Sequence, residues 1–533
     1  MNDSDPSPAS LSRREWLRIG ALAGTGALLS GCSKVIQRYT APKLPGSVAL
    51  PAGETEPITR LINRVSFGPT PGEVERVAAL GAERYVDEQL NADNGRETSF
   101  KLGQLLDPVQ SAKAALKRRD GEDLNLSLRL RSLEVPHGDT MDLRNLKERE
   151  VLMQLQQAAI LRAVYSRHQL RERLVDFWSN HFNIYAREGF RTYYKPADER
   201  SVIRQHALGS FPELLRASAH SPAMLFYLNN EANRRGVPNE NYARELMELH
   251  SLGVHGGYTQ KDVLEVARCF TGWRVEERFL KRRGTFFFDP SRHDDGPKTV
   301  LGVKIPAGGG QKDADKVLDI LARHPSTARF ISGKLCRYFL GDAATTWTEK
   351  MAAIYLKTNG NIKAMLRPML LSPELLHSPP ILKRPFDFLI SALRALNADT
   401  DGSIPLQQHL ARMGQPLYQW PMPDGYPDKT AAWTGSLLAR WNFAFALTAG
   451  SIKGTALDLP GLMRVAHATT DAQCTAALIE IVLSRRAEAD ALRPLHDKLL
   501  AHCGRVPRYG NKTRSVVAEA AALLLAAPEF QWR

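Results

Sequence analysis

Residues 239–271 constrain the fold of this chain more than any other stretch. Wound at about 100° per residue, residues 240–252 separate into an apolar arc and a polar arc, the pattern of an amphipathic helix. Residues 253–257 contain three glycines, which permit the positive φ values at which helices commonly end. Thr259 and Asp262 then have the spacing of a capping box. The stretch therefore predicts two helices joined by a tight turn, a rigid platform for polar side chains.

The first of these helices carries four candidate site residues. Glu245 and Glu248 are three residues apart, so their carboxylates point the same way and can converge on one cation or substrate. Arg244 either pairs with Glu248 on a solvated face or steadies an anionic substrate. His250 falls within the apolar arc, where a surface helix does not need an imidazole. His250 is therefore predicted to be either a hydrogen-bonded core histidine or a member of a buried polar site.

Two further histidines complete the candidate set. Apolar residues at steps of three and four place His181 on a buried helix face, again as a core histidine or a ligand. Residues 285–305 predict a small β-hairpin, with two short strands joined around His293 and Asp294. Both side chains are expected at the tip of a loop that leads to Lys298. Loops on a rigid body often carry ligands or acid–base groups.

The remainder of the chain is predicted to be mainly α-helical. Helical periodicity recurs through residues 58–533, which we expect to form one multi-helical body. Residues 91–145 are polar and lack a sustained period, so they are predicted to be a charged, partly ordered connection. Residues 402–433 are rich in proline and glycine and predict a long ordered loop, which is either a lid or pocket wall or a plain surface wrap.

Residues 1–31 are predicted to be a twin-arginine lipoprotein signal peptide. Residues 12–17, Ser-Arg-Arg-Glu-Trp-Leu, have the twin-arginine form. The apolar segment that follows is shorter than the roughly 20 residues that span a bilayer. Leu-Ser-Gly-Cys then predicts lipidation of Cys32, and residues 32–57 suit a tether. We therefore expect the twin-arginine export machinery as a partner, and a periplasmic or extracytoplasmic lipoprotein tethered to the membrane.

The net charge and the cysteine spacing indicate which classes of partner and cofactor this chain favours. The formal net charge is +14, which outside the cytoplasm favours anionic envelope polymers, lipid head groups or acidic substrates over nucleic acid. The chain has no C-x-x-C pair, which disfavours iron–sulfur clusters and thiolate zinc sites. Imidazole combined with carboxylate instead suits a divalent zinc, manganese or iron ion.

Several ordered blocks show a resemblance to a known family. They are RLINRVSFGPTPGEVERV, FWSNHFNI, NENYARELMELHSLGVHGGYTQKDVLEVARCFTGW, HDDGPKTVLG, HPSTARFISGKL, LKRPFDFLISALRAL and GQPLYQWPMPDGYPD. From about residue 58 to its last residue, the chain resembles the bacterial family called domain of unknown function 1800. The resemblance implies an exported, mainly helical protein, and no activity is securely attached to the family.

Two hypotheses of different classes follow from these residues. The first is an envelope-tethered enzyme that uses a metal ion or another cofactor and hydrolyses an anionic envelope or extracellular substrate. In it the metal ligands are His181, His250 and His293, and the catalytic groups are Arg244, Glu245, Glu248, Asp294 and Lys298. The second is a noncatalytic binding or assembly protein, in which the same groups form hydrogen bonds that lock helices together while the basic surface binds anionic polymer. The catalytic hypothesis depends on these side chains sharing one pocket.

Overall fold

The computed structural model describes residues 48–51, 55–91, 121–187, 189–278, 283–341, 345–486, 490, 492–503 and 513–533. The predicted signal peptide, Cys32 and the tether up to residue 47 lie outside the described residues, as do residues 92–120 of the predicted connection. Residues Ser47–Arg533 form one unit. None of the helices in the described ranges is both long enough and apolar enough to cross a bilayer.

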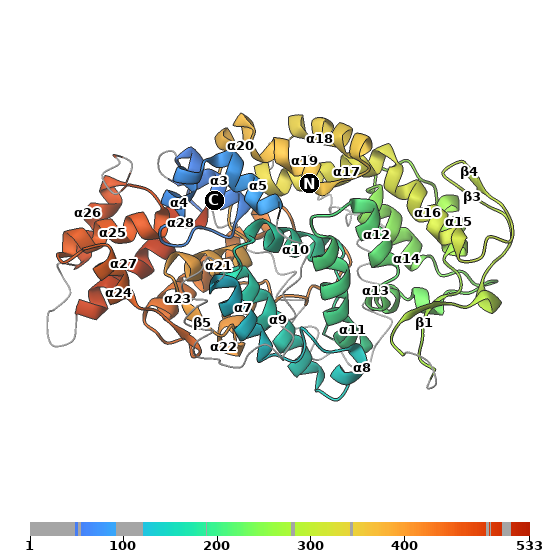
Figure 1. The fold of residues 1–533 in the computed structure, drawn as a ribbon, viewed down its shortest axis with the longest axis horizontal. Coiled ribbons are helices and arrows are strands. Elements are labelled where there is room, and N and C mark those ends of the chain that lie inside the picture. Colours follow the sequence, from blue (N-terminus) through green and yellow to red (C-terminus); the bar gives the residue numbers. More distant parts are fainter. Residues whose placement is uncertain are drawn as a thin grey trace, which may run out of the picture. The chain divides into compact units, whose positions relative to one another are not determined.

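The described chain is mainly α-helical, as predicted (Figure 1). Up to the central glycine turn the helices are α3 (Pro57–Val65), α4 (Glu73–Leu80), α5 (Ala82–Leu90), α7 (Gly121–Arg131), α8 (Thr140–Leu143), α9 (Glu148–Tyr165), α10 (Gln169–His181), α11 (Phe190–Asp198), the π-helix η2 (Glu199–Arg204), α12 (Phe211–Ala219), α13 (Pro222–Tyr227), the 3₁₀ helix η3 (Asn230–Ala232), α14 (Glu240–Glu245) and the π-helix η4 (Leu246–Ser251). Thus α7 and α8 occupy the later part of the predicted connection.

The second half is also helical. It contains α15 (Gln260–Cys269), η5 (Pro290–Arg292), α16 (Lys312–Arg323), α17 (Pro325–Leu340), α18 (Thr345–Thr358), α19 (Ile362–Leu370), α20 (Pro373–His377), α21 (Pro385–Ala395), α22 (Ile404–Arg412), η6 (Thr430–Ala432), η7 (Thr434–Ser436), α23 (Leu437–Thr448), α24 (Leu459–Val465), α25 (Asp471–Leu483), α26 (Arg493–Cys503), α27 (Thr513–Ala526) and α28 (Pro528–Gln531). Two large apolar clusters hold these helices together. One is built mainly from α3 to α20, and the other mainly from α21 to α28.

The strands pair differently from the predicted hairpin. β2 (Phe286–Phe288) pairs with β1 (Trp273–Val275), and β3 (Lys298–Val300) pairs with β4 (Val303–Ile305). The prediction that residues 286–288 pair with residues 300–303 was therefore wrong. Leu301 and Gly302 have φ values of 50° and 78°, which suit a two-residue hairpin turn. That turn places Val300 and Val303 on opposite strands. A third two-stranded sheet joins β5 (Asp399–Thr400) to β6 (Thr455–Ala456).

The central platform forms largely as predicted, with one change of register. The side chain of Thr259 accepts a hydrogen bond from the backbone of Asp262, and the capping box is complete. The first helix becomes π-helical at Leu246, where hydrogen bonds span five residues instead of four. Ser251 is buried in this π-helical turn and donates a 2.6 Å hydrogen bond to the carbonyl oxygen of Leu246.

The predicted loop-rich segment begins with a helix. Residues 404–412 form α22, because Ser403 stands at its N-cap and a proline follows within the first turn. The later part is an irregular segment anchored to the end of α10. The side-chain amide of Asn183 donates to the carbonyl oxygens of Trp420 and Met422 at 2.9 and 2.7 Å. Asn180 exchanges two hydrogen bonds with the backbone of Tyr426.

Candidate functional site

The polar side chains of the central helix contact one another and residues near the start of α15. Arg244 Nη2 lies 3.0 Å from Glu240 Oε2, and it also donates to the side chain of Gln260. Glu248 accepts a long, 3.5 Å hydrogen bond from the hydroxyl of Tyr258. Glu245 and Glu248 are both half-buried. This arc of the helix is tied to the start of α15 by ordinary polar contacts.

His181 and His250 are both buried, as their helical positions predicted. His181 Nε2 donates to the carbonyl oxygen of His250 at 3.2 Å, and the two ring centres are 6.1 Å apart. Burial, followed by the charge of Lys334, lowers the pKa of His250 to about 3, and the same two causes lower the pKa of His181. Both imidazoles are therefore neutral at ordinary pH. Among the described residues, His181 Nδ1 and His250 Nε2 have no hydrogen-bond partner.

His293 belongs to a separate buried network. The prediction that it lies at a loop tip was wrong, because its Nδ1 donates to the carbonyl oxygen of Thr271 at 2.8 Å and its ring is buried. Its Nε2 lies 3.2 Å from Asp313 Oδ2, which also pairs with Lys298 Nζ at 2.6 Å. Asp294 instead faces Arg268, whose guanidinium hydrogen bond lowers the pKa of Asp294 to about 2. These contacts fasten the strands β3 and β4 to neighbouring helices.

The three histidines do not come together as one ligand set. His181 and His250 are neighbours, but both ring nitrogens of His293 are hydrogen-bonded, to Thr271 and Asp313. In the described ranges, no group of three or more His, Cys, Asp or Glu side chains is placed to hold a metal ion. The predicted site residues thus divide into three networks, each of which holds its own helices or strands.

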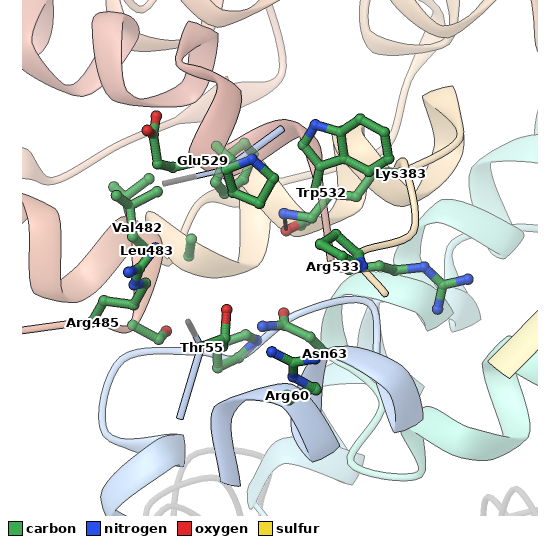
Figure 2. A pocket seen from close by; sticks show the side chains of 17 residues that line it. Thr55, Arg60, Asn63, Lys383, Val482, Leu483, Arg485, Glu529, Trp532 and Arg533 are labelled. Atoms are coloured by element: carbon green, nitrogen blue, oxygen red, sulfur yellow. Dashed lines mark hydrogen bonds between the residues drawn. The ribbon is translucent and has the colours of Figure 1, made fainter. Parts of the chain in front are cut away.

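A different site is a cavity of about 60 Å³ between α3, α21, α25 and α28, which we call the basic cavity. Figure 2 shows Lys383 and Trp532 on one side and Thr55, Arg60 and Asn63 on the opposite side. Its lining contains four basic residues and one acidic residue, namely Arg60, Lys383, Arg485, Arg533 and Glu529. The volume exceeds the roughly 10–15 Å³ that one water molecule needs, so the cavity can hold several. The basic cavity therefore suits a small anionic group.

Lys383 and Ser391 form a hydrogen-bonded pair in the wall of this cavity. Lys383 Nζ donates to Ser391 Oγ at 2.8 Å and lies 3.6 Å from the ring centre of Phe530. Both members of the pair are buried. Burial is the largest cause that lowers the pKa of Lys383 to about 7, and the charges of Arg533 and Arg440 act in the same direction. The amine is therefore close to half-protonated at neutral pH.

The pair is positioned by local backbone structure. An isolated β-bridge between Leu382 and Trp532 fixes the chain just before Lys383, and α21 then carries Ser391. Gly68, with φ of 122°, lies against the same serine. A Cβ atom on Gly68 would be 2.8 Å from Ser391 Oγ. A glycine is therefore needed where the turn after α3 approaches the hydroxyl.

Arg533 of the cavity lining interacts electrostatically with two further buried arginines, Arg64 and Arg173. In Figure 2 the guanidinium of Arg533 turns away from the other labelled side chains, and its Nη2 donates to the carbonyl oxygen of Tyr338. Arg173 pairs with Asp387 at 2.8 Å, and Arg64 is held by backbone and serine oxygens near residue 378. Within the described residues, two nitrogens of each of these three arginines have no hydrogen-bond acceptor. Arg533 Nε also lies 3.8 Å from Asp387 Oδ2, so Arg173 and Arg533 share one buried carboxylate.

Sequence reasoning missed the residues of this cavity. Arg64 and Arg173 lie on the apolar faces of α3 and α10, so the periodicity that identified His181 could also have identified them. For Lys383 and Ser391 the sequence offered only their membership of one block, LKRPFDFLISALRAL. Their pairing depends on the β-bridge to Trp532, about 150 residues along the chain.

Comparison with known proteins gives one family. The family model described as "Protein of unknown function (DUF1800)" matches residues 60–532. No curated protein matches the chain, and no solved structure matches it.

Proposed function

The chain belongs to the DUF1800 family, and because that description names no activity, we propose from its own residues that it is an envelope-tethered protein that binds a small anionic group in the basic cavity. The observation that carries the proposal is the imbalance of charge. Arg60, Lys383 and Arg485 line the cavity with one acidic residue, Glu529, while the guanidinium of Arg533 turns away from them.

Energetic reasoning supports an anion at this place. A buried guanidinium cannot shed its proton readily, and burial without enough opposite charge or acceptors is costly. The pKa of Arg64 is lowered by burial and by the charges of Arg533, Arg60 and Arg173, so these cations disfavour one another. An anionic group in the cavity would offset this repulsion and accept charge-assisted hydrogen bonds.

The surroundings of the predicted residues favour the binding hypothesis over a metal-dependent hydrolase. Arg244, Asp294 and Lys298 each have protein partners that hold local structure.

The proposed cellular location rests on sequence features. Residues 1–31 and Cys32 support export by the twin-arginine machinery, followed by lipid anchoring on the extracytoplasmic side. The expected ligand is therefore an acidic group of an envelope polymer or lipid head group.

Ligand binding can be tested with inorganic phosphate as the probe. Full-length protein is heated in phosphate and in chloride at equal ionic strength, and phosphate is expected to raise the unfolding temperature by mass action. Arg485→Gln removes a cationic side chain from the cavity wall and is expected to weaken phosphate binding by about tenfold or more.

Arg329→Gln is the matched control. Arg329 is an exposed arginine on α17 that pairs with Glu349, and its loss should leave phosphate binding unchanged. An equal effect of the two substitutions, or no difference between phosphate and chloride, would refute the basic cavity as an anion site.

A further inference from the structure

We propose that Ser391 is a nucleophile and Lys383 its general base, and that the basic cavity hydrolyses a short-chain carboxylic ester, such as an acetyl ester, of an anionic molecule. The inference rests on the proposed function, because the basic residues would bind the anionic part of the substrate. Ser391 and Lys383 both line the cavity, and their reactive atoms are 2.8 Å apart. That distance lies within the range required for direct proton transfer.

The hydroxyl of Ser391 is held in an unusual way for a helical serine. A serine or threonine inside a helix commonly donates to the carbonyl oxygen four residues earlier. Thr358 and Thr475 each donate in this way within their own helix. In the described part of the chain, the hydroxyl of Ser391 instead has Lys383 Nζ as its hydrogen-bond partner. Its proton is therefore available to a neutral amine.

Lys383 has the surroundings that a base needs. Its Nζ contacts the ring of Phe530 and the hydroxyl of Ser391, and it has no direct ion pair among the described residues. Burial and neighbouring positive charges lower its pKa to about 7, so a large fraction is neutral at neutral pH. A lysine prepared in this way can accept the serine proton without a third residue.

The reaction is balanced without any further reactant except water. Ser391 Oγ bonds to the ester carbonyl carbon while its proton passes to Lys383 Nζ. The bond from that carbon to the alcohol oxygen then breaks, and Lys383 returns the proton to the leaving alkoxide. Water adds to the acyl-serine with Lys383 again accepting a proton. The acyl–Oγ bond breaks, the serine is reprotonated, and a carboxylic acid is released.

The size of the cavity limits the acyl group. A cavity of about 60 Å³ has room for a short acyl group such as acetyl. The alcohol part must therefore remain toward the outside, where Arg485 lies on the wall. The substrate class is a short ester carried on an acidic molecule.

The test uses p-nitrophenyl acetate with the full-length protein. We expect p-nitrophenol release to rise with pH through about 7 and then level off, and we expect an acetyl adduct on Ser391 in a rapidly quenched peptide map. Ser391→Ala should abolish both signals, and Lys383→Gln should slow release by about 100-fold or more and remove the pH step. Ser391→Cys should keep an acetyl adduct, now on the cysteine sulfur.

Ser332→Ala is the matched control, because Ser332 is equally buried on α17 but has no hydrogen-bond partner among the described residues. This variant should behave like the natural protein. For Ser391→Ala and Ser332→Ala, which keep the basic residues of the lining, the phosphate stabilisation described above reports whether the cavity is intact. Stabilisation by phosphate without Ser391-dependent release overturns the nucleophile and leaves anion binding intact. Ser391-dependent release without phosphate stabilisation supports the nucleophile and overturns the anionic substrate.

Discussion

Replacement of Lys383 by methionine should change how the stability of the protein depends on pH. In the native protein burial lowers the pKa of Lys383 from 10.5 to about 7. Between these pH values the unfolded chain binds more protons than the native protein, so native stability rises with pH. At about 1.4 kcal/mol per pH unit, Lys383 contributes about 3 kcal/mol to this rise from about pH 6 to about pH 9. Lys383→Met removes that contribution.

The assay is urea unfolding of both proteins at the two pH values. The methionine variant also loses the hydrogen bond to Ser391 and the contact with Phe530. Those losses depend little on pH, so they largely cancel when the difference between the two proteins is compared across pH. The free energy of unfolding of the variant, relative to that of the natural protein, should therefore be higher at the lower pH than at the higher pH. Lys350→Met, at an exposed lysine, serves as control. Parallel pH profiles for the natural protein and Lys383→Met would show that Lys383 keeps its ordinary pKa.

Three other predictions concern the predicted networks and the central platform. Gly253→Ala should lower the unfolding temperature more than Gly257→Ala, because both glycines have positive φ but only at Gly253 would a Cβ approach Phe330, at 2.8 Å. Asp313→Asn should reduce the free energy of unfolding by about 3–5 kcal/mol in urea, since it leaves a buried lysine without its carboxylate. His250→Gln should lessen the loss of stability on acidification from about pH 6 to about pH 4. The pKa of His250 falls from 6.5 to about 3 on folding, so the histidine stabilises the native protein above its unfolded pKa, and this stability is lost as the pH falls. A pH profile of the urea midpoint identical to that of the natural protein would refute this last prediction.

Local patterns were enough to predict much of the fold. Helical spacing predicted the burial of His181 and His250, because a residue's place on a helix face depends on its near neighbours in sequence. The capping box of Thr259 and Asp262 formed as predicted for the same reason. The spacing did not reveal the π-helical turn, because hydrogen bonds that span five residues change which side chains face the core.

Partners distant in sequence could not be predicted in this way. Residues 286–288 formed a strand, but their partner was β1 because a tight turn at Leu301 kept residues 298–305 as a separate hairpin. The assembly of the candidate site was likewise beyond local reasoning. The turn-rich sequence placed His293 at the tip of a loop, and only the folded chain brings Asp313 to it. Lys383 and Ser391 could be identified as site residues only from the cavity that they line in the folded chain.

Pro51 and Thr55 form part of the cavity wall, so the stretch that leads back toward Cys32 departs from the site itself. Pro51 is 19 residues after Cys32, and a fully extended chain of that length reaches no more than about 65 Å. With Cys32 lipidated as proposed, this short tether would keep the cavity within a thin layer next to the bilayer. Molecules fixed near the membrane would then meet it at high local concentration, whereas material farther out would remain beyond its reach.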